Sequence, residues 1–73
     1  MGDVLYVLEG RRTGSDRFEL LDRTGDPDTA GFWCGTLHME MRCGAYDWTR
    51  VLRVHQPKNS MHQLTEVLRE RKQ

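Results

Sequence analysis

The 73 residues of the chain are too few for two cores, so we expect a single domain over residues 1–73. Its 37% hydrophobic and 30% charged residues are typical of a globular protein and exclude the composition of a disordered one. Eleven basic residues balance eleven acidic ones, so no overall positive field favours a nucleic acid or an anionic membrane as partner.

The apolar run at the start of the chain ends at Leu8, which is too short for the core of a signal peptide. No segment approaches the roughly 20 apolar residues that span a bilayer. We therefore expect a cytoplasmic protein with no membrane partner.

Two β-strands are expected first. Residues 3–9, DVLYVLE, are β-branched, aromatic and aliphatic, and residues 17–22, RFELLD, alternate apolar and polar side chains. The polar, glycine-containing stretch between them predicts a hairpin loop of about seven residues. Because the first strand is apolar on both faces, we expect it at the centre of a sheet with cover on two sides.

The sequence DPD at residues 26–28 predicts the start of a helix over residues 27–42. Asp26 can accept backbone N–H bonds as the N-cap, Pro27 suits the first helical position, and Asp28 meets the positive end of the helix dipole. At 100° per residue, the apolar side chains fall within one arc of the helix. Gly44 is the expected C-terminal stop signal of the helix. The residues of this arc are Ala30, Trp33, Cys34, Leu37 and Met41.

A strand is the rival interpretation of this segment. Residues 37–43, LHMEMRC, alternate as a strand does, and Gly31 and Gly35 each destabilise a helix by roughly 1 kcal/mol relative to alanine. Leucine, methionine, glutamate and arginine are nevertheless good helix formers, and a strand would leave the start signal without a role. We therefore favour the helix.

A third strand and a second helix are expected in the last part of the chain. In residues 45–55, Tyr46, Trp48, Leu52 and Val54 share one face at strand spacing, interrupted only by Arg50. Ser60 and Gln63 then have the spacing of a capping box, which predicts a C-terminal helix. The apolar stripe of that helix consists of Met61, Leu64, Val67 and Leu68.

The expected fold class is therefore α+β, with the element order ββαβα. A right-handed crossover through the central helix predicts a three-stranded antiparallel sheet of order 2-1-3, with the central helix on one face and the C-terminal helix available for the other. The alternative is a mostly β protein, a four-stranded meander followed by a C-terminal helix.

Five side chains could in principle bind a metal, namely Cys34, His38, Cys43, His55 and His62. Cys34 and His38 have i, i+4 spacing, but no second pair has the close spacing of a structural zinc site. No cysteine has the partnered histidine of a catalytic nucleophile, and Cys34 and Cys43 lie too far apart for a disulfide in either a helix or a strand. We expect free thiols, no metal, no cofactor and no enzymatic activity.

The face of the central helix turned away from the sheet carries the strongest functional signal. Phe32 and Met39 project there beside Gly35 and Thr36, with Arg42 at the rim. Exposed aromatic and methionine side chains over a glycine floor are typical of a protein interface. We expect a small interaction module, an inhibitor or adaptor of a larger machine such as phage-encoded and accessory proteins provide, or a homodimer. Packing of the C-terminal helix on this face is the competing explanation.

Binding of nucleic acid or phosphate is the second functional hypothesis. Arg11 and Arg12 lie in the expected hairpin loop, and Arg50 and Arg53 flank Trp48 on the expected third strand. Because Trp48 shares its face with Leu52 and Val54, burial against a helix explains it more simply than base stacking.

Overall fold

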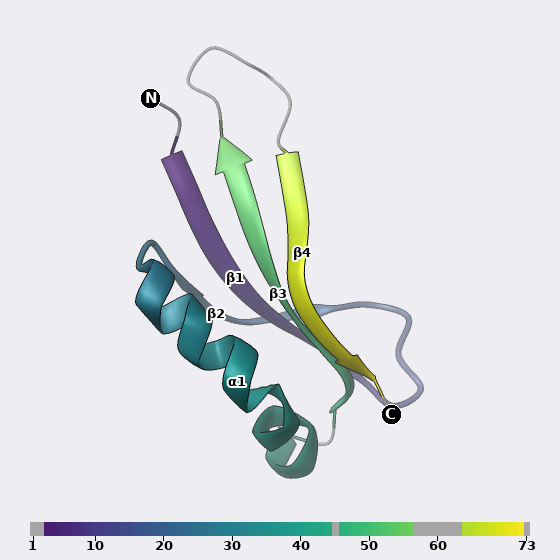
Figure 1. The fold of residues 1–73 in the computed structure, drawn as a ribbon. Coiled ribbons are helices and arrows are strands. Elements are labelled where there is room, and N and C mark those ends of the chain that lie inside the picture. Colours follow the sequence, from purple (N-terminus) through teal and green to yellow (C-terminus); the bar gives the residue numbers. More distant parts are fainter. Residues whose placement is uncertain (1–2, 45, 57–63, 73) are drawn as a thin grey trace.

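The computed structural model describes residues 3–44, 46–56 and 64–72. They form four strands and one helix in the order ββαββ (Figure 1). The elements are β1 (Asp3–Arg12), β2 (Glu19–Thr24), α1 (Pro27–Gly44), β3 (Tyr46–Gln56) and β4 (Leu64–Lys72). Together they make a small α+β fold in which a single antiparallel sheet carries one helix.

The sheet has the order β2-β1-β3-β4, with every neighbouring pair antiparallel. The expected order 2-1-3 is therefore correct for the first three strands, and β1 lies at the centre as predicted. The prediction of only three strands is wrong, and the count of four agrees with the alternative. The fourth strand, however, is the C-terminal segment and not the middle of the chain.

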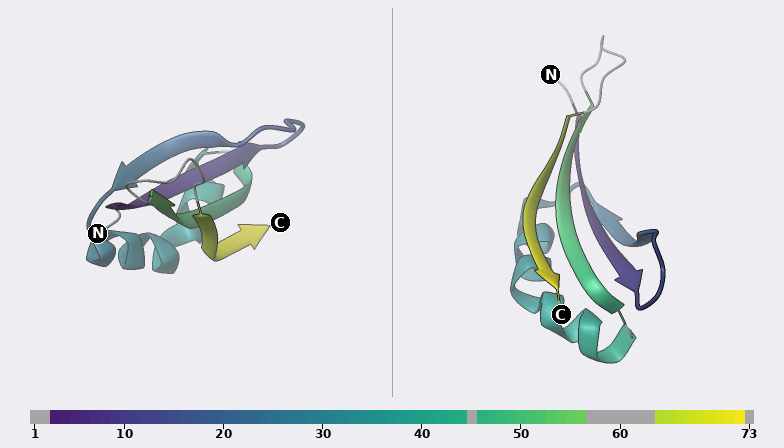
Figure 2. Two further views of the ribbon diagram at one scale, coloured as in Figure 1. Left: turned by 90° about the horizontal axis from the view of Figure 1, so that it is seen from above. Right: turned by 90° about the vertical axis from the view of Figure 1, so that its right-hand side faces the viewer.

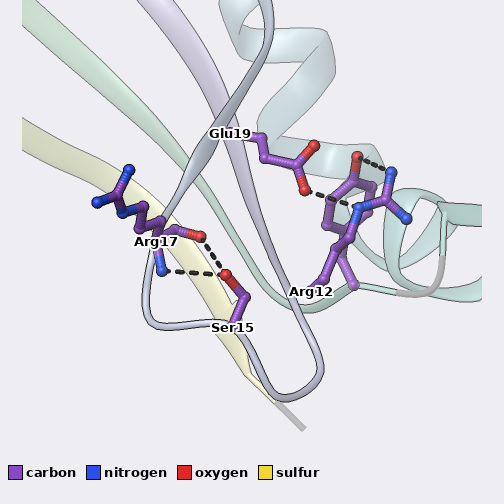
Figure 3. A network of polar contacts seen from close by, with 5 residues as sticks. Arg12, Ser15, Arg17 and Glu19 are labelled. Atoms are coloured by element: carbon purple, nitrogen blue, oxygen red, sulfur yellow. Dashed lines mark hydrogen bonds and ion pairs between the residues drawn. The ribbon is translucent and has the colours of Figure 1, made fainter.

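The connection between β1 and β2 spans residues 13–18, close to the expected length of about seven. It is shifted along the chain, because β1 continues to Arg12 and β2 begins only at Glu19. Gly14 takes a positive φ of 85° in the connecting turn, a conformation that glycine adopts without strain. The amide of Ser15 donates to the carbonyl of Arg12 over 3.0 Å, and the Ser15 hydroxyl accepts the amide of Arg17 over 3.2 Å (Figure 3).

The helix α1 begins where the sequence predicts. Asp26 Oδ1 accepts a hydrogen bond from the Asp28 amide at 3.2 Å, and Oδ2 accepts one from the Thr29 hydroxyl at 2.8 Å. The Asp26 carbonyl accepts a hydrogen bond from the Ala30 amide at 3.2 Å. Asp26 is therefore the N-cap. The helical interpretation of residues 27–42 is confirmed, and the helix continues to Gly44.

The core lies between α1 and the two central strands. Ala30, Trp33 and Leu37 of the helix are buried against Leu8 of β1 and Val51 of β3. All three helical residues belong to the arc that the sequence assigned to the core. The fully buried hydroxyl of Thr49 in β3 donates a hydrogen bond to the carbonyl of Leu37 in α1 at 3.4 Å.

We call the side of the sheet under α1 the covered face and the other side the open face. Leu8 pairs with Val51 across β1 and β3 on the covered face, whereas Val7 pairs with Leu52 on the open face. No described helix or strand lies over the open face, and α1 stays on one side in both views of Figure 2. Leu52 and Val54 on this face are nevertheless buried. The helix that was expected to cover the second side of β1 is therefore absent from the described elements.

Two predictions about β3 side chains are wrong. Trp48 pairs with Arg11 on the open face, so it does not pack on a helix. Tyr46 lies on the other face, because the pairing of β1 with β3 is irregular between Arg11 and Arg12. Its ring covers Gly10, where a Cβ atom would come within 2.8 Å of it. Glycine is required at that position.

The prediction of a C-terminal helix is also wrong. Leu64–Lys72 is a strand, and it pairs with β3 over most of the strand's length. Helix propensity is a weak preference, which the backbone hydrogen bonds and cross-strand side-chain contacts with β3 outweigh here. Arg53 and Glu66, directly opposite each other, reinforce the pairing. The expected capping box at Ser60 and Gln63 lies outside the described residues.

We predict that Leu37→Ala and Met39→Ala have opposite outcomes, although the two residues are only two positions apart. Leu37 is buried, so its truncation should lower the free energy of unfolding by about 2–5 kcal/mol. Met39 is exposed, so its truncation should change it by less than about 0.5 kcal/mol. Urea denaturation of both variants tests this, and an equal loss in the two would contradict the observed orientation of α1.

Candidate functional site

The outer face of α1 is the face turned away from the sheet. Phe32 is 69% exposed and Met39 52% exposed there, although both are large apolar side chains. Gly35 between them is exposed, and Thr36 is half-buried with its hydroxyl donating to the carbonyl of Phe32 over 3.1 Å. Four of the five residues predicted as partner-binding are thus described on this face. For Arg42 the structure describes only the helical backbone.

The two glycines of the outer face have free space above them. A Cβ atom built on Gly31 or Gly35 would meet no atom of the described fold within 4 Å, in contrast to Gly10. Neither takes the positive φ that would require glycine. Because nothing inside the described fold explains them, their cost of roughly 1 kcal/mol each to the helix has no internal compensation.

The C-terminal segment does not cover the outer face. It forms β4, which pairs with β3 at the edge of the sheet beyond the core (Figure 1). The competing explanation for Phe32 and Met39, that a C-terminal helix packs on them, is therefore wrong for residues 64–72. Both side chains remain exposed in the part of the fold that is described.

The four arginines predicted to bind anions do not form one patch. Arg11 and Arg50 belong to the open face, whereas Arg12 and Arg53 belong to the covered face. Each lies beside a carboxylate of the same chain. The ion pairs are Arg11 with Asp47 at 3.9 Å, Arg12 with Glu19 at 2.7 Å, Arg50 with Glu9 at 2.8 Å and Arg53 with Glu66 at 2.6 Å.

These ion pairs shift the proton affinities of their members in the expected directions. The hydrogen bond and charge of Glu19 raise the pKa of Arg12 (Figure 3), and those of Glu66 raise the pKa of Arg53. The hydrogen bond from Arg53 in turn lowers the pKa of Glu66. Phosphate binding by these guanidinium groups would have to compete with the carboxylates already beside them.

The sequence did not predict a cation–aromatic cluster that lies on the open face. The Phe18 and Trp48 rings meet edge to face with centroids 4.9 Å apart. The Arg50 guanidinium lies 3.6 Å from the Phe18 centroid, and Lys72 Nζ lies 3.8 Å from the Trp48 centroid. Arg11 lies 4.9 Å from the same Trp48 ring. The cations occupy positions over the rings and limit the surface available for stacking on a base.

The metal ligands considered from the sequence do not come together in the described residues. The described chain holds no group of three histidine, cysteine or acidic side chains that could bind a metal. Cys34 is a half-buried free thiol packed beside the core, and His55 contacts Glu66 at 3.4 Å. The side chains of His38 and Cys43, and all of His62, lie outside the description.

One shallow hollow lies between α1 and β4, with a volume of about 90 Å³. Its walls are Cys34, Gly35 and Leu37 from the helix and Arg69, Glu70 and Arg71 from the strand. This volume is far smaller than the ligand pockets of about 300–1,000 Å³ that hold small molecules. Arg69 and Arg71, which line the hollow, belong to the edge strand β4.

Comparison of the chain with protein-family models, curated proteins and solved structures gave no significant match. Within the described residues, no helix is both long enough and apolar enough to cross a bilayer. The exposed outer face of α1 and the edges of the sheet are therefore the surfaces from which a function can be inferred.

We predict that the cap that starts α1 is sensitive to acid. Hydrogen bonds from the Thr29 hydroxyl and the Asp28 amide lower the pKa of Asp26 below its usual 3.8, so its ionised form stabilises the fold above that value. This contribution is lost as the pH falls through the lowered pKa. Asp26→Ala should therefore lower the melting temperature by a few degrees near neutrality, and the difference from wild type should shrink in acid.

Asp26→Asn is the matched control, because asparagine caps helices about as well as aspartate without titrating in this range. It should retain the cap at every pH, so acidification should destabilise wild type relative to this variant. Thermal melts at about pH 7 and about pH 3 measure the difference. An Asp26→Ala variant as stable as wild type near neutrality would exclude the capping role.

Proposed function

We propose that the protein is a small non-enzymatic protein–protein interaction module that acts as an inhibitor or adaptor of a larger assembly. The outer face of α1 is its proposed docking surface, with Phe32 and Met39 as anchors and Gly31, Gly35 and Thr36 as the floor. Arg42 is proposed as a polar contact at the rim. The partner is a protein with an apolar patch of its own.

The observation that carries this proposal is the presence of two uncompensated glycines beside an exposed phenylalanine. Small residues let another surface approach the helix backbone closely, and aromatic and methionine side chains bury large area and adapt in shape. Burying the Phe32 side chain alone would contribute about 1.5–3 kcal/mol to association. No contact within the described fold supplies a different reason for this combination.

Nucleic acid or phosphate binding is the second candidate. One observation favours it, since Trp48 lies on the open face of a sheet together with Arg11, Arg50 and Lys72. The ion pairs of Arg11 and Arg50 weaken the case. The two candidates differ in salt dependence, because neutralisation of phosphates makes log affinity for an oligonucleotide fall steeply with log salt.

We predict that Phe32→Ser combined with Met39→Gln removes binding without unfolding the protein. Both side chains are exposed, so the melting temperature should stay close to that of wild type. Tagged wild-type and variant proteins should be compared as baits in extract of the source cells, with quantitative mass spectrometry. A partner bound through this face should be enriched by wild type and lost from the variant.

Leu20→Ser combined with Leu64→Gln is the matched control, since it removes two equally exposed apolar side chains from the sheet edges. This control should retain any partner that the outer face binds. If wild type and the Phe32 and Met39 variant enrich the same proteins, the outer face is not the docking surface. A large loss of stability in that variant would instead assign these side chains to the core.

We predict that Gly31→Ala and Gly35→Ala separate stability from binding. Each should raise the free energy of unfolding by about 1 kcal/mol, because alanine favours the helix and meets no atom within 4 Å. Each should also weaken capture of the partner, because the added methyl group blocks close approach. Gly25→Ala, before the helix and equally unobstructed, is the control that should leave capture unchanged. Unaltered capture by both helix variants would remove the glycines from the interface.

A further inference from the structure

The two outer strands of the sheet each have an unpaired edge. β2 pairs only with β1 and β4 pairs only with β3, so the outward N–H and C=O groups of both strands have no partner in the described sheet. All nine residues of β4 are exposed, including the large apolar Leu64 and Val67. Such an edge is a template for a further strand.

The strand directions make the two edges compatible with each other. Every neighbouring pair is antiparallel, so β2 and β4 at the two ends of the four-strand sheet run in opposite directions. When two copies stand side by side in the same orientation, β4 of one therefore lies antiparallel to β2 of the next. In this arrangement α1 is on the same side of the joined sheet in both copies.

The register of the sheet shows which residues would then be opposite. The strand pairings connect residues of all four strands at the same level across the sheet. One level consists of Asp22, Leu8, Val51 and Arg69, and another of Glu19, Gly10, Thr49 and Arg71. Without any shift along the strands, Arg69 and Arg71 of one copy reach the levels of Asp22 and Glu19 of the next.

The charges of these residues are complementary and lie on the covered face. Arg69 and Arg71 form no ion pair with any described residue, and neither does Asp22, whereas Glu19 also contacts Arg12. Opposite charges directly across an antiparallel pair stabilise it. The hollow beside Arg69 and Arg71 leaves space for incoming carboxylates.

We propose that the protein associates head to tail with itself, β4 of one copy pairing with β2 of the next in a continuous antiparallel sheet. Arg69 opposes Asp22 and Arg71 opposes Glu19 at each junction. This contact uses two different surfaces, so it continues into a chain or closes into a ring. A two-fold pairing of two β4 strands about Arg69 or Arg71 is less favourable, since it sets identical arginines opposite each other.

The junction is small and therefore weak. It comprises five level-matched residue pairs, and each edge contains one irregular residue, Leu21 in β2 and Leu68 in β4. Such a contact buries less than the roughly 1,000 Å² of a stable interface, so association should depend on concentration. Because its ion pairs are at the surface, salt should weaken it. The outer face of α1 takes no part, so Phe32→Ser with Met39→Gln should leave self-association intact.

A charge-swap experiment on the Asp22 and Arg69 pair tests the proposal. Sedimentation velocity of the full chain should be measured from about 10 μM to about 1 mM at low salt, a range suited to a weak contact. Wild type should associate with rising concentration. Asp22→Arg and Arg69→Glu should each weaken association by at least about tenfold, because like charges then meet at the junction. In an equimolar mixture every junction between the two different variants carries opposite charges, so association should recover.

The turn between β1 and β2 offers matched controls. Asp16→Arg and Arg17→Glu make the same charge changes at exposed positions outside both strands, and they should associate as wild type does. A wild-type chain that remains monomeric throughout the range overturns the proposal. An Asp22→Arg variant that associates normally while Arg69→Glu does not would also overturn it, because β4 would then pair with an occupant other than β2. Failure of these tests leaves the proposed docking role of α1 untouched.

Discussion

The packing of α1 on the two central strands is the constraint on which the rest of the structure depends. One helix covers one face of a sheet that has two, and Trp33 and Leu37 fix which side of the helix is buried. Once they are seated on Leu8 and Val51, the rotation of α1 leaves Phe32 outside. The exposed outer face is thus a direct consequence of how the core is made.

The pairing of the strands determines which charged side chains are neighbours. Antiparallel register sets Arg53 opposite Glu66 and Arg50 opposite Glu9, so guanidinium groups that are far from carboxylates in the sequence become their neighbours. In the described sheet, β2 and β4 each have only one neighbouring strand, so no residue lies opposite their outer edges. Arg69 and Arg71 at the edge of β4 are therefore available for an external carboxylate, in contrast to the arginines inside the sheet.

Local signals in the sequence were sufficient for α1, because an N-cap, a proline and a periodic apolar arc all agree on one helix. They also predicted that Phe32 faces away from the sheet, but not whether another segment covers it. They were insufficient for β4, whose residues favour a helix locally but complete the edge of β3 in the fold. Irregular pairing near Arg11 moved Tyr46 to the other face of β3, and no local pattern predicts such a shift. The ion pairs of the arginines likewise required the register between strands.

The most direct test of this account is a NOESY spectrum of the isolated protein, which reports which side chains of α1 contact the sheet. The Trp33 ring and the Leu37 methyl groups should show contacts to Leu8 and Val51, and the Phe32 ring should show none to either strand. Contacts between the Phe32 ring and Leu8 or Val51 would show that the helix is rotated and that the proposed docking surface is part of the core.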